Sequence, residues 1–150
     1  MKYLNVLFFN VLFFFGFIAL QLIIQIPIVM LIKNLSEPWF SLIYAGKKTI
    51  EIRLHKGHFG ELKLNDTIEF FNDDLGLRRK FCIKVLNIEM FDTFEELLSK
   101  HLSQALPTVK TIENGVKILR KIYSQEDELK YKVAAIHVER ISAVVNEDLK

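Results

Sequence analysis

The stretch Gly46-Lys47-Lys48-Thr49-Ile50-Glu51-Ile52-Arg53 decides the fold expected for this chain. A glycine tolerates the positive φ with which many helices end, and the β-branched residues after Gly46 favour an extended strand. Side chains alternate between the two faces of a strand, so Ile50 and Ile52 share one face with the following leucine. The octapeptide therefore predicts the end of a helix and then a strand with one apolar face toward the core and one polar face.

The polar face of this strand has the composition of a binding site. Thr49, Glu51 and Arg53 alternate along it, and the long side chain of Lys48 reaches the same space from the entrance of the strand. A carboxylate beside two cations can accept a hydrogen bond from the amino group of a base and hold a phosphate or a carbonyl oxygen. The alternative is a solvated strand face with a surface ion pair, which would contribute little to stability.

The segments around the octapeptide favour the binding site. Residues 35–45 (LSEPWFSLIYA) precede it, and residues 64–70 (LNDTIEF) and 131–136 (YKVAAI) follow it. With these segments and the spacing Gly-x-Lys-x-x-Glu-x-Arg, the chain closely resembles the ASCH domain family, a branch of the PUA-like folds, over about residues 30 to 140. The resemblance implies an α+β fold, a small PUA-like mixed β-barrel with flanking helices. It also implies an RNA or nucleotide site in the cleft beside the motif strand.

One branch of that family consists of amidohydrolases that deacetylate N4-acetylcytidine with a lysine, a threonine three residues later and a glutamate. Lys48 matches the lysine, whereas Glu51 stands at the position of the threonine. Glu113 is the nearest candidate for the catalytic glutamate. If the chain were an enzyme, Lys48, Glu51 and Glu113 would be its catalytic residues, but Glu51 favours a binding domain.

Residues 1–32 differ in composition from the rest of the chain. Lys2 is their one charged side chain, and most of the others are Phe, Leu, Ile and Val. At about 1.5 Å per residue, a helix over residues 3–32 is long enough to cross a hydrocarbon core of about 30 Å. This run exceeds the apolar region of a signal peptide, so a transmembrane helix is the first hypothesis. Lysines and an arginine follow it closely, which predicts a single-pass protein with its C-terminal domain in the cytoplasm.

A second account of the same segment stays open. Met30 stands directly before Leu31-Ile32-Lys33-Asn34-Leu35, which has the pattern of a first strand. A chain that started at Met30 would be a cytoplasmic ASCH domain, and the segment before it an upstream extension of the reading frame. The domain expected in either case covers residues 33–141, and residues 142–150 are expected to be a flexible tail.

Charge and cysteine content limit the partners of this domain. Lys2 is one of 20 basic residues, which leaves 19 against 18 acidic residues from residue 33 onward. A nearly neutral domain favours a short RNA or a single modified nucleoside over a long duplex, because affinity for a duplex rises with the number of phosphates neutralised. Cys82 is the only cysteine, so no intrachain disulfide is expected. His55 and His58 lack a third committed ligand, and neither a metal nor a cofactor is predicted.

Hydrophobic periodicity and capping signals place the other elements. Strands are predicted at residues 31–35, 67–71, 79–88 and 133–140, and residues 125–130 read as a charged turn. The first helix is expected to be capped by Ser36 and to bury Trp39, Leu42 and Ile43 before it ends at Gly46. A capping box at residues 92–95 opens the second helix, and Thr111 caps the third, in which Val116, Leu119, Ile122 and Tyr123 have helical spacing.

Trp39 has two roles open to it. It follows Pro38 at the start of the first helix, where an aromatic ring can pack in the core or stack on a base at the mouth of the cleft. The predicted ligand-binding residues are thus Trp39, Lys48, Thr49, Glu51 and Arg53. The sequence favours an RNA or nucleoside binder, with the amidohydrolase and a membrane-anchored interaction module without catalysis as alternatives.

Overall fold

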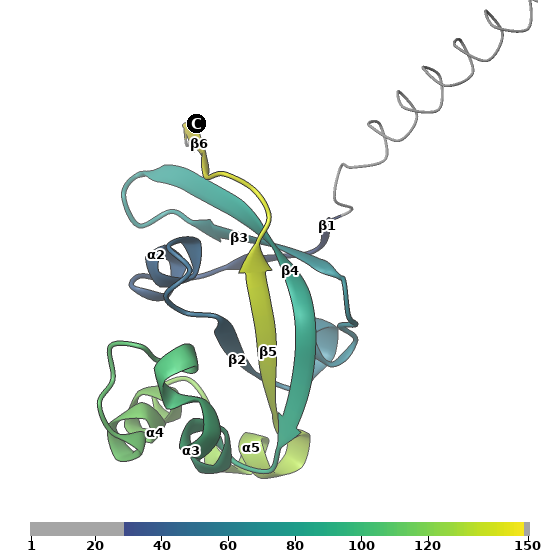
Figure 1. Cartoon of the computed structure of the whole chain (residues 1–150), viewed down its shortest axis with the longest axis vertical. Coiled ribbons are helices and arrows are strands. Elements are labelled where there is room, and N and C mark those ends of the chain that lie inside the picture. Colours follow the sequence, from purple (N-terminus) through teal and green to yellow (C-terminus); the bar gives the residue numbers. More distant parts are fainter. Residues whose placement is uncertain (1–28, 149–150) are drawn as a thin grey trace, which may run out of the picture.

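A six-stranded mixed sheet forms the centre of the structure (Figure 1), a computed structural model that describes residues 29–148. The pair β1–β3 is parallel, and all other pairs are antiparallel. The strands follow the order β1 (Val29–Asn34), β3 (Thr67–Asn72), β4 (Leu77–Phe91), β5 (Val133–Arg140) and β2 (Ile50–Leu54), and β6 (Val145–Asp148) pairs with the start of β4.

The sheet curls into a half-barrel. Its longest strand, β4, pairs with β6 and β3 along its first half and with β5 along its second half. The pairing with β5 shifts register between Val85 and Asn87, and such a bulge bends a strand. Among the residues described, β1 and β2 are edge strands of this sheet, so the mixed β-barrel expected from the sequence takes the form of an open half-barrel, which with its flanking helices fits a PUA-like α+β fold.

The helices flank this sheet in two places (Figure 1). Helix α2 (Trp39–Tyr44) follows β1, and a short 3-10 helix, η1 (Gly57–Gly60), follows β2. Helices α3 (Phe94–Ala105), α4 (Ile112–Arg120) and α5 (Gln125–Tyr131) lie together at the end of the sheet where β4 ends and β5 begins. Gly115 belongs to the close packing of α3 and α4, since a Cβ there would lie 2.7 Å from Leu98 Cδ1.

Two groups of buried side chains hold the elements together. The first lies under α2 and includes Phe40, Phe70 and Phe81. The second joins β2 to α3 and α4, and it contains Ile50 and Ile52. The predicted apolar face of the motif strand is therefore confirmed as a core face.

Helix α2 differs from the prediction at its start. Its N-cap is Pro38, without a side-chain hydrogen bond, and Ser36 contributes only its backbone carbonyl, which accepts from Phe40 N. Phe40 and Ile43 are the buried residues, because the helix begins three residues after Ser36 and so turns Trp39 and Leu42 toward partly open positions. The end is as predicted, with Gly46 at φ 69° directly after the C-cap.

The other two caps follow the sequence closely. Thr93 caps α3 by accepting from Glu96 N, and Glu96 Oε2 accepts from Asp92 N. The cap lies one residue later than expected, and the carboxylate that reaches back bonds to the residue before the N-cap and not to the N-cap itself, as it would in a capping box. Thr111 caps α4 as predicted, by accepting from Asn114 N.

Residues 125–131 form helix α5 instead of the charged turn that was predicted. Ser124 caps this helix, and Glu128 is its buried residue, with an exposed fraction of 1%. Glu128 Oε1 accepts from Phe94 N, and Arg120 pairs with Oε2. The interpretation as a turn was wrong because acidic residues normally face solvent, whereas this carboxylate is buried with two partners.

The two ends of the domain also differ from the prediction. The expected flexible tail, residues 142–150, contains β6, which pairs with Leu77–Lys80. At the other end, β1 already begins at Val29, so residues 29–32 belong to the sheet and not to an apolar helix. The rest of the predicted membrane span lies outside the described residues. No helix between residues 29 and 148 is both long enough and apolar enough to cross a bilayer.

Candidate functional site

A cavity of about 220 Å³ lies beside β2. The end of β1 and helix α2 border it on one side, and α4 borders it on the other. Its polar lining comes from Asn34, Ser36, Lys48, Glu51, Arg53 and Tyr123. Its apolar lining consists of Leu35, Trp39, Ile52, Leu106, Ile118, Leu119 and Ile122. The motif strand thus supplies charge to a cavity that has largely apolar walls.

Lys48 is buried at the base of this cavity, with a side-chain exposure of 3%. Its Nζ donates to the carbonyl oxygens of Ile50 and Ala105, each at 2.6 Å, and lies 3.2 Å from Glu51 Oε2. Three acceptors match the three N–H donors of an ammonium group. Lys48 therefore ties β2 to the end of α3 and holds Glu51, with no donor left over for a ligand.

Glu51 stands between two cations. One carboxylate oxygen faces Lys48, and the other lies 2.9 Å from Arg53 Nη2. Each carboxylate oxygen has two lone pairs, so each can accept a second hydrogen bond from the cavity. The side chain is 7% exposed, which gives the site a fixed acceptor with limited contact to water.

Arg53 is the most open of the three charged residues, with 21% of its side chain exposed. Its guanidinium lies 4.8 Å from the ring centroid of Phe59 in η1. Its Nε is buried and has no hydrogen-bond partner among the described residues. Arg53 therefore lines the cavity with a guanidinium group that is only partly exposed.

Burial and charge shift the pKa values of the two cations in opposite directions. Burial lowers the pKa of Lys48, and the facing Glu51 carboxylate offsets only part of that change. Burial also lowers the pKa of Arg53, but Glu51 and Tyr123 outweigh it, so the net pKa is raised. Burial raises the pKa of the Tyr123 hydroxyl, which stays protonated at neutral pH. Arg53 and Tyr123 hence both offer donors at the cavity.

Trp39 is half-buried and packs against both groups of core side chains. It also lines the cavity, where its ring lies 5.6 Å from Lys48 Nζ. Trp39 therefore packs against the core and also lines the cavity, so core packing and contact with a ligand are compatible roles for it.

Two of the predicted site residues lie elsewhere. Thr49 precedes β2, is exposed and is not among the residues that line the cavity; its N–H donates to Gln104 O. Glu113 lies in the first turn of α4, where its side chain is 76% exposed and pairs with Lys117 at 2.6 Å. Among the described residues that line the cavity, Glu51 is the only carboxylate. The structure therefore brings together Trp39, Lys48, Glu51 and Arg53 and leaves Thr49 and Glu113 outside.

Asn34, Ser36 and Tyr123 were not predicted as site residues. Tyr123 was assigned to the same helix as Leu119, but α4 ends at Arg120 and Tyr123 lies in the turn after it; both residues line the cavity. Its hydroxyl could have indicated a functional role, because the other residues with that helical spacing are apolar. Asn34 and Ser36 have no such signal, because their position depends on the pairing of β1 with β3.

The family model for the ASCH domain matches residues 34–142. The chain belongs to the ASCH domain family. This match and the half-barrel confirm the resemblance seen in the sequence, including the PUA-like α+β fold.

Solved structures support the same relationship. The hypothetical protein PH0355 is 40% identical, with a TM-score of 0.66 over 74% of this chain and 98% of its own. Protein PF0455 from Pyrococcus furiosus is 34% identical, with a TM-score of 0.60 over 75% and 97% of the two chains. An ASCH protein from Zymomonas mobilis, 16% identical with a TM-score of 0.54 over 79% and 72%, shares the fold. No functionally curated protein matches the chain.

Metal-ligating side chains come together away from this cavity. His55, directly after β2, and His58, in η1, are exposed and do not form a group of three ligands with Glu51 or Glu61 in the described part of the chain. Such a group is formed by Glu89, His101 and His137, which no motif in the sequence indicates.

Proposed function

We propose that this ASCH domain binds a single nucleoside, or one unpaired base of an RNA, in the cavity beside β2. The observation that carries the proposal is the pair of Glu51 and Arg53 at 2.9 Å, held by buried Lys48 at the wall of a cavity that Trp39 also lines. This arrangement offers fixed acceptors, a guanidinium donor and an aromatic ring within one small space.

Each of these groups suits a part of a nucleoside. The free lone pairs of Glu51 can accept from the exocyclic amine of cytosine or adenine. The guanidinium of Arg53 has N–H donors besides those near Glu51, and it can donate to a carbonyl or phosphate oxygen; a charge-assisted bond of this kind is stronger than a neutral one. Trp39 supplies a face on which a base can stack, the usual way in which proteins bind unpaired RNA bases.

The size and charge of the domain favour a short ligand. The cavity of about 220 Å³ is smaller than the pockets of about 300–1,000 Å³ that hold drug-sized molecules, so it has room for one base and not for several. The whole chain has a net charge of +2, which gives little attraction for a long phosphate backbone.

The substitution Arg53→Ala tests this proposal. The expected result is a loss of affinity for the best-binding nucleoside or short oligoribonucleotide of about tenfold or more, because a charge-assisted hydrogen bond is lost. The fold should persist, since Glu51 keeps its contact with Lys48. Binding is measured by calorimetry for nucleosides and by fluorescence anisotropy for labelled RNA, with circular dichroism as the check on folding.

The matched control is Arg78→Ala. Arg78 pairs with Asp73 at 2.7 Å beside the turn that joins β3 and β4, and its loss changes the net charge by the same amount. Binding should be unchanged in this variant. If Arg53→Ala bound as tightly as the wild type, or if both variants lost the same affinity, the cavity would not be the binding site.

A further inference from the structure

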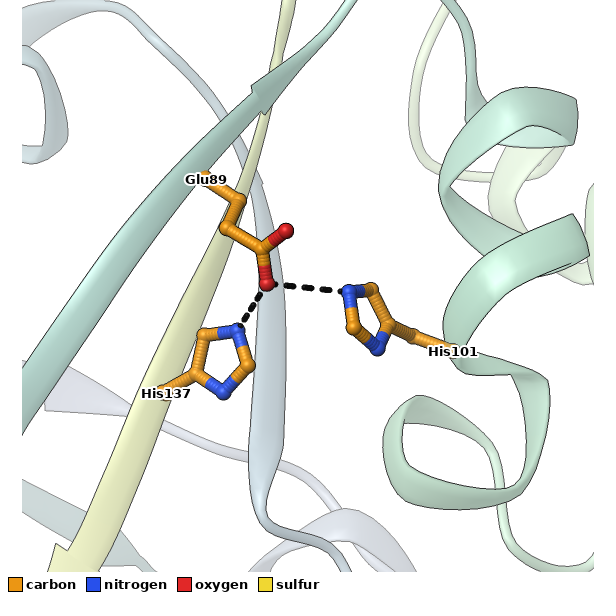
Figure 2. Close-up of side chains that lie close together, drawn as sticks. All are labelled: Glu89, His101 and His137. Carbon is orange, nitrogen blue, oxygen red and sulfur yellow. Dashed lines mark hydrogen bonds and ion pairs between the residues drawn. The ribbon is translucent and has the colours of Figure 1, made fainter.

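A second polar cluster joins β4, β5 and α3 outside the cavity that was proposed to bind a nucleoside. Glu89 comes from β4, His137 from β5 and His101 from α3, and Figure 2 shows both imidazole rings directed at one oxygen of Glu89. Glu89 Oε1 lies 2.6 Å from His137 Nε2 and 3.0 Å from His101 Nε2. The three potential ligand atoms all lie within 4.8 Å of one another.

His101 is oriented for ligation by a neighbour on its own helix. Its Nδ1 lies 3.0 Å from Gln104 Oε1, and an amide oxygen can only accept, so Nδ1 carries the proton. Nε2 is then the nitrogen left for a cation; it is buried, faces Glu89 and makes no hydrogen bond within the described part of the chain. The side chain is 9% exposed. Because Nε2 lies 3.0 Å from Glu89 Oε1, either a proton or a metal ion has to lie between these two atoms.

The carboxylate of Glu89 is also positioned to bind a cation. Lys100 pairs with its Oε2 and leaves Oε1 to the two histidines. About a quarter of the Glu89 and His137 side chains is exposed, at 23% and 24%, which gives an ion and a water molecule access from solvent.

We propose that Glu89, His101 and His137 bind a divalent transition-metal ion, with Zn²⁺ as the best match. Two imidazoles and one carboxylate are a known ligand set for zinc, and three protein ligands leave a fourth position for water. Magnesium and calcium prefer sites made only of oxygen ligands. The bond from Gln104 to His101 Nδ1 matches the outer-shell contact that fixes the tautomer of histidine ligands in metal sites.

The distances fit such an ion after small side-chain rotations. Ligand bonds of about 2.0–2.2 Å in a tetrahedral site place neighbouring ligand atoms about 3.3–3.5 Å apart. The contacts of 2.6 Å and 3.0 Å have to open by less than about 1 Å to reach that spacing. His137 releases its Nε2 proton when it becomes a ligand, and that proton passes to solvent.

The cluster is connected to the cavity through the end of α3. The carbonyl oxygen of Gln104 accepts from Thr49 N, and that of Ala105 accepts from Lys48 Nζ. An ion that joins α3 to β4 and β5 would therefore also stabilise the backbone that positions Lys48. The metal site itself does not depend on the proposal of nucleoside binding.

The test uses the full 150-residue chain without an affinity tag, purified in a mild detergent and treated with a chelator. Zn²⁺ is titrated by calorimetry, and Co²⁺ serves as a coloured substitute whose absorption reports coordination number. One ion per chain is expected. His101→Ala, His137→Ala and Glu89→Gln should each weaken binding at least tenfold, as the loss of a ligand or its supporting contact does. Zn²⁺ should also raise the melting temperature of the wild type.

The chain contains its own matched control, because its other two histidines lie away from this cluster, one directly after β2 and one in η1. The double variant His55→Ala/His58→Ala should bind Zn²⁺ like the wild type. Absence of stoichiometric binding to the wild type, loss of binding in this control, or unchanged binding in His101→Ala/His137→Ala would overturn the proposal.

A second measurement covers the case in which ligand variants fail to fold. X-ray absorption at the zinc edge, on the Zn²⁺-loaded His55→Ala/His58→Ala protein, should show two imidazoles and a further oxygen ligand. Fewer than two imidazoles, or a sulfur ligand from Cys82, would equally overturn the proposal.

Discussion

At the scale of single residues, the environment of Lys48 bears directly on whether the domain is a hydrolase. A catalytic base needs a lone pair directed at a substrate or a water molecule. Burial lowers the pKa of Lys48, which would help such a role, but three acceptors of the protein surround its Nζ. A neutral amine has two N–H bonds and could not satisfy all three, so the geometry favours the ammonium form and a positioning role.

We therefore predict that the wild-type domain releases little or no acetate from N4-acetylcytidine. Glu51 stands where the hydrolases of the family have threonine, and its longer side chain would crowd an N4-acetyl group. The formation of cytidine is followed by chromatography for the wild type, Glu51→Thr and Lys48→Ala. Turnover in the wild type that Lys48→Ala abolishes would establish an amidohydrolase and contradict the binding function. Activity gained only in Glu51→Thr would indicate a binding domain on a hydrolase scaffold.

At the scale of the secondary structure elements, helix α5 stabilises the start of α3. Glu128 is 1% exposed, accepts from Phe94 N at 2.6 Å and pairs with Arg120. Its removal would leave a buried N–H and a cation without their partner. The removal of one member of a buried ion pair generally destabilises a protein by about 3–5 kcal/mol.

The predicted effect of Glu128→Ala is thus a fall in the free energy of unfolding by about 3 kcal/mol or more. Urea unfolding followed by the fluorescence of Trp39, the only tryptophan, measures it. Glu126→Ala is the matched control on the same helix, because Glu126 is exposed in the first turn and contributes less than about 1 kcal/mol. Similar losses in the two variants would show that Glu128 acts only through the net charge of the helix.

The elements that the sequence predicted are those with local signals. Gly46 at positive φ, the cap at Thr111 and the alternation of Ile50 and Ile52 each depend on a few neighbouring residues, and the structure confirms them. Lys48, Glu51 and Arg53 could be grouped in advance because strand alternation and one long side chain sufficed.

The features that the sequence did not predict depend on contacts between distant segments. Glu128 is buried only because Arg120 and the start of α3 pack against it. Glu89 and His137 face each other through the pairing of β4 with β5, 48 residues apart along the chain. A pattern within one segment contains no information about such partners. The acidic segment was therefore predicted as a turn, and the cluster of Glu89, His101 and His137 was not predicted.

At the scale of the whole molecule, the start of β1 limits where a membrane segment can end. Val29 to Asn34 pair with β3, so residues 29–32 cannot also belong to a helix in the bilayer. The apolar run before Val29 still has 26 residues from Tyr3 onward, about 39 Å as a helix, and a span needs about 30 Å. The folded domain and a membrane segment are therefore compatible within one chain.

We predict that the full chain fractionates with membranes and resists extraction with alkaline carbonate, because the segment before Val29 contains a single charge, at Lys2. A chain that starts at Met30 is the matched control. It lacks only Val29 of β1 and keeps the pairs from Leu31–Ile68 to Asn34–Phe71, so it should fold and remain in the supernatant. Mass spectrometry of the natural N-terminus decides which form the cell makes. A natural start at Met30 would exclude the membrane anchor, whereas a full-length chain that carbonate extracts would show that the apolar segment does not insert.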